Sequence, residues 1–484
     1  MTTGAIAPKL GRLAWPLVLG NLLQTVYNVA DMFWVGRVGP EAVAAVSLMF
    51  PLSWMFVSTA MGITAATIAF VSQHVGAGER READHVVAQT ILLTLAVSGA
   101  LAALGFAFRR PLLTLIGARG QVFVEALAYV EVIFAALPFT FLFFAFRAAL
   151  QGAGDTKTAM WLMVLSAGAN VVLDPFFILG WGPFPEWGTF GAGVATFLSR
   201  GAVTVAGIAV LLHGGFGVRL RIGDLRPDPD TLTDLVDVGY PATLDGWARS
   251  FAAVVMAGFV ARFGPAATAA YGIGVRLMSI SWSVAGAVGQ ATATGVGQNL
   301  GAGTPDRAAR VTYVATLATM GILFAAAALV VAFPAVAMRV FIDDPAVVAE
   351  GIVFLRVIAP FWAFFGGVMV IQGAFRGAGK TKVAMVLSLL SRWVLRVPFA
   401  VVFAFAWSVA VPGLGVTVSA LDWGVEGIWW AFSVGAFGSF LVAVLWFRRG
   451  TWTEGVVEGE GGPEGPPAGP VTPTDESDPE SVDD

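Results

Sequence analysis

The chain has 484 residues, of which 57% are hydrophobic and 12% are charged, and its mean hydropathy is +0.79. Soluble domains carry about 25% charged residues, so this composition excludes a soluble globular protein and indicates a polytopic membrane protein. The net charge is −4, and the chain contains no cysteine, which excludes disulfides, thiol redox chemistry and thiolate metal sites.

Apolar segments follow one another along the chain, six before a polar break and six after it. They are expected at 12–36, 43–71, 86–108, 121–149, 159–180 and 189–213, and then at 232–262, 268–297, 311–334, 349–375, 383–411 and 425–447. A helix of about 20 residues crosses a bilayer. We therefore expect an all-α integral membrane fold with twelve transmembrane helices, an N-lobe at 1–213, a cytoplasmic linker at 214–231 and a C-lobe at 232–449.

The positive charges of the loops indicate the orientation of these helices. With the N-terminus inside, twelve Lys and Arg residues fall in inner loops and six in outer loops. Because cytoplasmic loops are enriched in these residues, both termini are expected in the cytoplasm, with the protein in the plasma membrane. We expect a monomer without a nucleic-acid partner.

The chain ends in an acidic segment. Residues 451–484 contain ten acidic residues and no basic ones, together with many Pro and Gly residues. Such a composition cannot bury enough apolar surface to fold, so residues 450–484 are expected to be a disordered tail. Ending the chain after Arg449 should leave transport unchanged within about twofold.

An internal repeat with a constant offset of 225 residues relates the two halves. It carries the QxxGAG turn at 73–78 onto 298–303, and GAGDTK at 152–157 onto GAGKTK at 377–382. The lysines lack the spacing of a phosphate-binding P-loop, so these loops are read as tight turns. Since each half has six spans, the lobes share one membrane orientation and should be related by a pseudo-twofold axis along the membrane normal, with a cavity between them.

The first span carries a polar face. Side chains three or four residues apart lie on one side of a helix, and here they are Asn21, Gln24, Asn28 and Asp31. Hydrocarbon offers them no partner, and a charge at the bilayer centre costs at least a few kcal/mol, so this face should meet the protein interior or a water-filled cavity. Pro16 has no N–H to donate, and we expect a bend near the start of this helix.

The fifth and sixth spans supply polar groups at the depth of Asp31. Asn170 and Asp174 share a helix face in the fifth span, and Thr196 lies at a similar depth in the sixth. Two carboxylates, a carboxamide and a hydroxyl suit a hard cation such as Na⁺. Two close carboxylates can also hold a proton near neutral pH. We expect these four residues to form a coupling site for Na⁺ or H⁺.

The second half lacks this set of residues, because the repeat carries Asp31 onto Met256 and Asp174 onto Phe399. An ion site in the C-lobe is therefore not expected. Two plainer interpretations stay open at this point. Asp31 could be an interfacial residue, and Asp174 with Pro175 could be a capping or turn feature.

The C-lobe carries other charges within its spans. Asp245 and Arg249 share a face of the seventh span, and Arg392 and Arg396 share a face of the eleventh. They could form a structural salt-bridge network or line the substrate cavity, and both readings stay open. The candidates for that cavity are Asn21, Gln24, Asp245 and Arg249.

Residues 12–448 resemble the multidrug and toxic compound extrusion (MATE) transporters, in their DinF-like branch. The resemblance rests on the two six-helix halves, Trp15-Pro16 followed by Asp31, the QxxGAG turn, FRAALQGAGDTK and NVVLDP. It implies that Asp31, Asn170, Asp174 and Thr196 form the coupling-ion site, with Tyr27 and Asn28 beside it and Pro16 at a helix bend.

The resemblance also implies a function. Members of that family exchange organic cations or xenobiotics for Na⁺ or H⁺ by rocking between two states, without a cofactor. We expect an antiporter that exports amphipathic, cationic compounds, with a flippase for lipid-linked precursors as the alternative. No nucleophile–base pair or cofactor motif supports an enzyme, and a purely structural protein would leave the buried carboxylates without a purpose.

Overall fold

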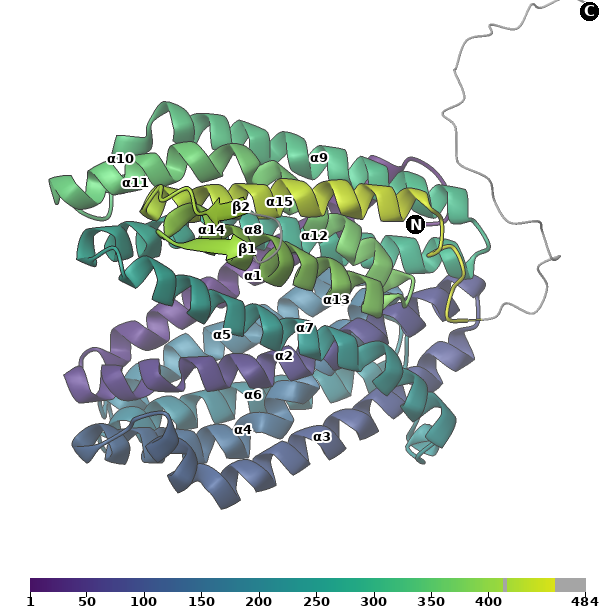
Figure 1. Cartoon of the computed structure of the whole chain (residues 1–484). Coiled ribbons are helices and arrows are strands. Elements are labelled where there is room, and N and C mark those ends of the chain that lie inside the picture. Colours follow the sequence, from purple (N-terminus) through teal and green to yellow (C-terminus); the bar gives the residue numbers. More distant parts are fainter. Residues whose placement is uncertain (412–415, 458–484) are drawn as a thin grey trace, which may run out of the picture.

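The computed structural model describes residues 1–411 and 416–457, which form two lobes of long helices (Figure 1). The N-lobe contains α1 (Ile6–Val35), α2 (Pro40–Ala77), α3 (Arg80–Leu115), α4 (Gly120–Ala153), α5 (Thr156–Ile178) and α6 (Gly188–His213). Each of these helices corresponds to one predicted span. Their ends extend beyond the apolar segments because polar residues continue the helices past the hydrocarbon region.

The C-lobe follows a short turn, η1 (Ile222–Asp224), and begins with three long helices, α7 (Pro229–Ala261), α8 (Pro265–Gly301) and α9 (Pro305–Ala332). The next span is α11 (Pro345–Ile358) joined to α12 (Trp362–Gly377) through η2 (Ala359–Phe361), after the short helix α10 (Pro334–Arg339). The following span is α13 (Thr381–Leu389), η3 (Leu390–Arg396) and α14 (Val397–Ala404), and the last is α15 (Val425–Arg448). Twelve spans therefore cross in the predicted order.

Ten of the spans are helices that are long and apolar enough to cross a membrane. The remaining two, α1 and α8, belong to different lobes and pack against each other. Their more polar sequences fit this central position, since a helix between two lobes meets protein and cavity rather than lipid alone.

The predicted span at 383–411 is wrong at its end. The helix stops at Ala404, and an antiparallel hairpin of β1 (Ser408–Val411) and β2 (Val416–Ser419) follows it, with Ser408 opposite Ser419. The sequence VVFAFAWSVAV stays apolar across this boundary, so hydropathy alone does not reveal where the helix ends.

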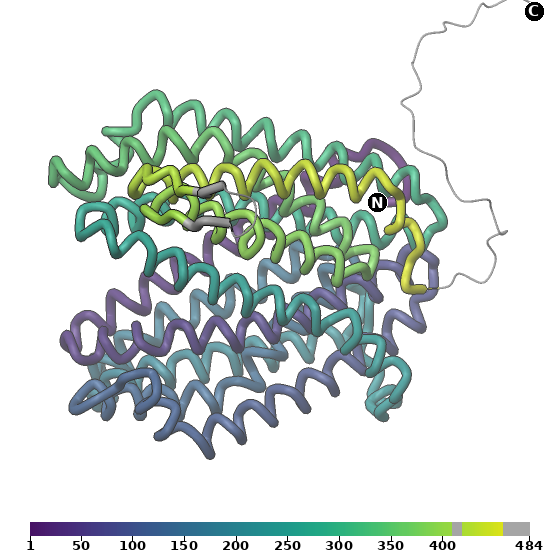
Figure 2. The backbone as a smooth tube through the Cα atoms, viewed as in Figure 1, coloured from purple at the N-terminus to yellow at the C-terminus, as the bar shows by residue number. Residues whose placement is uncertain are grey.

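The N-terminus and the last described segment, 450–457, lie at the same end of the bundle (Figure 2), which we call the terminal end. Here two glutamines at corresponding positions of the repeat each donate a hydrogen bond to the opposite lobe. Gln73 Nε2 donates to the carbonyl oxygen of Gly377 (2.9 Å), and Gln298 Nε2 donates to that of Gly152 (3.1 Å). The repeat offset of 225 residues exchanges the two contacts. We call this pair the glutamine lock.

Two glycines allow the backbones to meet at the lock. A Cβ on Gly76 would lie 2.1 Å from the carbonyl oxygen of Gln298, and a Cβ on Gly301 would lie 1.9 Å from that of Gln73. Real Cβ atoms do not approach backbone oxygen so closely, so only glycine fits at both positions. The lobes also meet further along α2, where Trp247 Nε1 donates to the Met55 carbonyl oxygen (3.2 Å).

The N-terminus and the segment 450–457 add further bonds to the lock. The N–H groups of Val456 and Val457 donate to Gln73 Oε1 (2.8 and 3.2 Å), and the amino group of Met1 donates to Gln298 Oε1 (3.4 Å). Each lock glutamine therefore has its oxygen bonded by one end of the chain and its nitrogen bonded to the opposite lobe.

The segment 450–457 differs from the predicted disordered tail. Trp452 is only 2% exposed, and its indole stacks on Phe447 at 4.5 Å between ring centroids and donates to the Phe447 carbonyl oxygen (2.8 Å). An indole can bury a large apolar area and still satisfy its N–H, which outweighs the polar composition around it. The remainder of the predicted tail, 458–484, lies outside the described residues.

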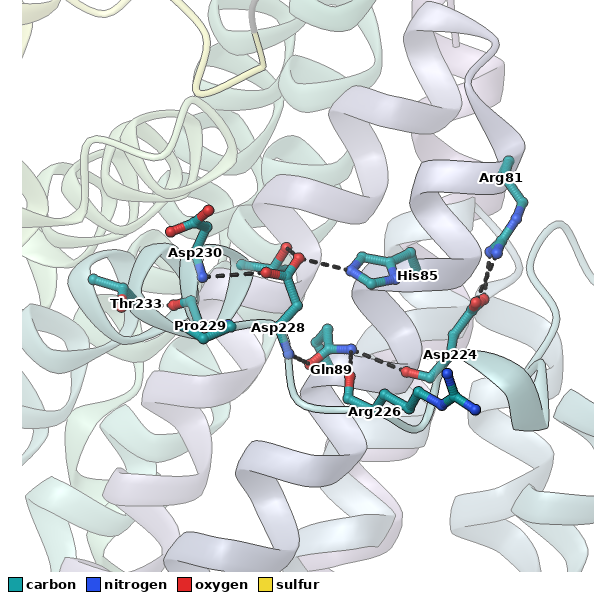
Figure 3. Close-up of polar contacts among 10 residues, drawn as sticks. Arg81, His85, Gln89, Asp224, Arg226, Asp228, Pro229, Asp230 and Thr233 are labelled. Atoms are coloured by element: carbon teal, nitrogen blue, oxygen red, sulfur yellow. Dashed lines mark hydrogen bonds and ion pairs between the residues drawn. The ribbon is translucent and has the colours of Figure 1, made fainter.

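The predicted linker at 214–231 is held against α3 (Figure 3). Arg81 pairs with Asp224, and this hydrogen bond lowers the pKa of the Asp224 carboxyl. Gln89 donates to the Asp224 and Arg226 carbonyl oxygens (2.9 and 2.8 Å). Asp228 pairs with His85 (3.0 Å) and accepts from the N–H of Asp230 (3.2 Å), so it also caps α7. The linker is therefore held against α3 by hydrogen bonds and ion pairs.

We predict that Gly76→Val opens the terminal end. The added side chain would clash with the backbone of the opposite lobe. Overpacking of this kind costs about 1–3 kcal/mol. This cost would raise the population of molecules that are open at the terminal end about tenfold. The chain has no natural cysteine, so maleimide labelling of Ser72→Cys, a buried lock position, reports opening. Gly99→Val is the matched control, because nothing lies within 4 Å of a Cβ there. Equal labelling of both variants would show that the lock does not close this end.

We also predict that two truncations behave differently. A chain ended after Arg449 loses the buried Trp452 indole and both donors to Gln73, and removing a buried Trp costs about 3–5 kcal/mol. Its thermal midpoint in detergent should fall, whereas a chain ended after Val457 should keep the full-length midpoint. Equal midpoints for the two truncations would mean that the segment 450–457 contributes nothing to stability.

Candidate ion-coupling site

Three N-lobe helices bring the predicted coupling residues together. Tyr27 and Asp31 come from α1, Asn170 and Asp174 from α5, and Thr196 from α6. The Tyr27 hydroxyl lies 3.3 Å from Thr196 Oγ1. We call these five residues the carboxylate site.

The Asn170 carboxamide connects α5 to α6. In one orientation its Nδ2 donates to Thr196 Oγ1 (3.4 Å). In the other, Nδ2 donates to Asp174 Oδ2 (3.2 Å) and the amide oxygen accepts from the Thr196 N–H (3.3 Å). The second orientation satisfies both ends of the amide and gives Asp174 its hydrogen bond. Asn170 and Asp174 are both fully buried.

Both carboxylates keep an oxygen without a partner. Among the residues that the structure describes, Oδ1 of Asp31 and Oδ1 of Asp174 are buried and accept no hydrogen bond. Tyr27 from the helix of Asp31 and Asn170 from the helix of Asp174 both lie beside Thr196 Oγ1, at 3.3 and 3.4 Å. A buried oxygen acceptor without a donor is costly, and two such oxygens beside a carboxamide and a hydroxyl fit a hard cation or a proton.

A transition-metal site is a different matter. In the described part of the chain, no group of three or more His, Cys, Asp or Glu side chains could hold a metal ion. A sodium ion would instead be held by oxygens of Asp31 and Asp174 together with those of Asn170 and Thr196, because Na⁺ takes neutral oxygens as readily as carboxylates.

The other polar residues of α1 lie apart from the carboxylate site. Gln24 Nε2 donates to Asn28 Oδ1 (3.0 Å) on an exposed side of the helix. Asn21 Nδ2 donates to the Ser283 carbonyl oxygen of α8 (3.4 Å). These side chains share a broad helix face with Asp31, but they bond to other partners than Tyr27 does, whose hydroxyl lies beside Thr196. Asn28 therefore has Gln24 as its hydrogen-bond partner in this conformation, and its place in the coupling site stays a prediction.

Two N-lobe arginines were not among the predicted site residues. Arg200, on α6, is 6% exposed and lies over the rings of Tyr27 (5.7 Å) and Phe143 (4.4 Å). Arg147, on α4, donates to Asn21 Oδ1 (3.1 Å). Both occur in otherwise apolar segments, and an arginine in such a segment is itself a signal of function.

Pro16 lies inside α1, which continues as one helix from Ile6 to Val35. Its side chain is buried, and its neighbours Leu13 and Leu17 pack in one cluster with Ala291 of the C-lobe. The missing N–H leaves the helix one hydrogen bond weaker at this turn. Pro16 is therefore the position at which α1 can bend, while the helix on both sides of it is regular.

Comparison with known proteins agrees with this architecture. A family model described as MatE matches residues 16–176 and 241–402, which are corresponding parts of the two repeats. The chain belongs to the MATE family. Members of this family are transporters, which confirms the prediction that this protein is a multi-pass membrane transporter and not an enzyme. The DinF-like branch stays a prediction.

Curated relatives and solved structures cover most of the chain. "Probable multidrug resistance protein YoeA" of Bacillus subtilis is 30% identical over 83% of this chain and 88% of its own length. The "FAD transporter" of Shewanella oneidensis is 30% identical over 63% of this chain and 68% of its own. A crystal structure of MATE in complex with MaL6 matches with a TM-score of 0.83 and 26% identity, over 92% of this chain and 96% of that one. The two-lobe, twelve-helix fold is thereby confirmed.

Proposed function

We propose that this protein exports amphipathic organic compounds across the plasma membrane in exchange for H⁺ or Na⁺, with both termini in the cytoplasm. The observation that carries the proposal is the pair of buried carboxylate oxygens, on Asp31 and Asp174, that have no hydrogen-bond partner among the described residues. The names of relatives such as YoeA, a probable multidrug resistance protein, support an export function.

The coupling follows from the electrostatics of the carboxylate site. Without a cation the two charges repel each other, which weakens the packing of α1 on α5 and α6. A proton or Na⁺ removes that repulsion and lets Asp31 approach Asp174, which moves α1 relative to the rest of the N-lobe. Because α1 also packs on α8 of the other lobe, this movement changes the surface between the lobes.

Alternating access requires that one end opens as the other closes. The described contacts close the terminal end through the glutamine lock. If that end is cytoplasmic, as the loop charges predict, this conformation corresponds to the outward-facing state. A cation taken from outside then binds first and drives release of the compound.

The carboxylate site favours a positively charged group on the compound, since that group and the coupling cation would compete for the same acidic region. A second candidate is a flippase for lipid-linked precursors, which carry phosphate. The arginines of the C-lobe favour it, as does the relative named FAD transporter, whose cargo is phosphorylated. Both candidates use the same two-lobe machinery.

We predict that Asp31→Asn and Asp174→Asn each reduce cation-driven efflux about 100-fold, which corresponds to a coupling free energy of about 2.7 kcal/mol. The substitution keeps the shape of each side chain and removes its charge. The assay is ethidium efflux from proteoliposomes under an imposed pH or Na⁺ gradient. Asp343→Asn, at an exposed loop position, is the matched control. Wild-type efflux by both purified variants would exclude the carboxylate site as the coupling site.

We also predict that α1 changes shape when the carboxylate site binds a cation. Spin labels at the two ends of α1 should report a shorter distance at pH 6 or with Na⁺ than at pH 8 without it. Pro16→Ala restores a backbone donor and should reduce the change. If α1 keeps one length in every condition while the lobes still move, its bending is not part of the mechanism, although the ion site could remain.

A further inference from the structure

We propose that four arginines of the C-lobe form a binding site for an anionic group, a phosphate above all, on the transported compound. They come from α7, α12 and η3 and are Arg249, Arg376, Arg392 and Arg396. The role in transport rests on the proposed export function, whereas the binding of the anion is independent of it. We call this set the arginine cluster.

The cluster has a large excess of positive charge. Asp245 is the one acidic group that forms an ion pair with any of these arginines in the described part of the chain. Arg249 and Arg376 both donate to Asp245 Oδ2, at 2.7 and 3.3 Å. Arg392 and Arg396, four residues apart in η3, add two further guanidinium groups, so the four arginines and one carboxylate carry a net charge of +3. This excess would repel a cationic group and attract an anionic one.

Two of the arginines are buried without an anion. Arg396 is 8% exposed, its Nε has no partner among the described residues, and its guanidinium lies over the Phe432 ring at 4.1 Å. Arg392 is also 8% exposed and bonds to Ser388 on its own helix. A buried, unpaired charge costs several kcal/mol. An anion placed between these groups would remove that penalty.

The other two arginines give access to the cluster. The side chain of Arg249 is 39% exposed and that of Arg376 is 28% exposed, although both lie within membrane spans. Nε of Arg249 is buried and has no partner in the described part of the chain. An anion could therefore reach the cluster past Arg249 and Arg376 and come to rest against Arg392 and Arg396.

The repeat indicates that the arginines are not needed for the fold. Their counterparts in the N-lobe, 225 residues earlier, are uncharged: Gln24, Gln151, Ala167 and Val171. The N-lobe forms the same helices without any of these charges. A structural salt-bridge network would moreover need acids in proportion to bases, and this cluster has one carboxylate for four guanidinium groups.

The local backbone is adapted to this arrangement. Arg392 and Arg396 lie in η3, a π-helical turn that interrupts the span between α13 and α14. Pro398 follows the turn and cannot donate to the carbonyl oxygen of Val394. Such widened turns occur frequently at functional sites. Guanidinium groups bind phosphate through paired N–H donors, which explains four arginines rather than lysines.

The test compares two ligands that differ only in a phosphate. Flavin mononucleotide carries one, and riboflavin has the same ring and side chain without it. In titrations of the purified full-length protein, flavin mononucleotide should bind at least about tenfold more tightly than riboflavin, because charge-assisted hydrogen bonds to phosphate are strong.

Substitution of Arg396, whose buried Nε has no partner among the described residues, should remove the difference in affinity between the two flavins. Arg396→Gln should weaken binding of flavin mononucleotide about tenfold and leave riboflavin unchanged. Arg396→Lys keeps the charge and should restore part of the affinity. Arg339→Gln, at an exposed position on α10, is the matched control and should bind like the wild type. Circular dichroism and thermal midpoints establish that each variant is folded.

The outcomes separate this proposal from the export function. Asp31→Asn should bind flavin mononucleotide normally even though it fails in cation-driven efflux. Equal affinity for the two flavins, no binding of flavin mononucleotide, or binding that Arg396→Gln leaves unchanged would each overturn the arginine cluster as an anion site. None of these results depends on whether H⁺ or Na⁺ drives transport.

Discussion

Hydrocarbon offers no partner to an ionised side chain, so every charge within a membrane span must find one inside the protein or in a cavity. In this chain the charges divide between the lobes. The N-lobe gathers Asp31 and Asp174 beside neutral oxygen groups, and the C-lobe gathers arginines around Asp245. Because each group has unsatisfied atoms, each is poised to accept a ligand of opposite charge. Most of the remaining spans are apolar, with Arg147 on α4 as an exception, and they hold these two centres in place.

The repeat supplies a common frame for this division of chemistry. The glutamine lock shows this symmetry most directly. Gln73 and Gln298 each donate a hydrogen bond to a backbone carbonyl oxygen of the opposite lobe. The frame is symmetric where the lobes must come together and separate. It is asymmetric where ligands bind, since Asp31 corresponds to Met256 and Asp174 to Phe399. A duplicated scaffold can thus carry a cation site in one half and an anion site in the other.

The sequence predicted the twelve spans, the repeat and the set of residues at the carboxylate site, because hydropathy, offset and helical depth are local or periodic properties. It did not predict contacts that depend on tertiary structure. The bond between Val456 and Gln73 joins residues 383 positions apart, and composition alone placed Val456 in a disordered tail. Arg200 over Tyr27 is a similar case, since a ring contact between α1 and α6 leaves no periodic trace. The apolar hairpin after Ala404 was mistaken for helix because hydropathy does not distinguish the two.

The central claim is that cation occupancy of the carboxylate site decides which end of the bundle is closed. The most direct measurement is the distance between spin labels at the end opposite the termini, on Leu115→Cys in the N-lobe and Val340→Cys in the C-lobe. Both positions are exposed, at 84% and 73%, and the chain has no other cysteine. The account predicts two distances, with a shift of about tenfold in their populations toward the shorter one when H⁺ or Na⁺ is added. A single distribution that is unchanged by pH and Na⁺ would contradict it.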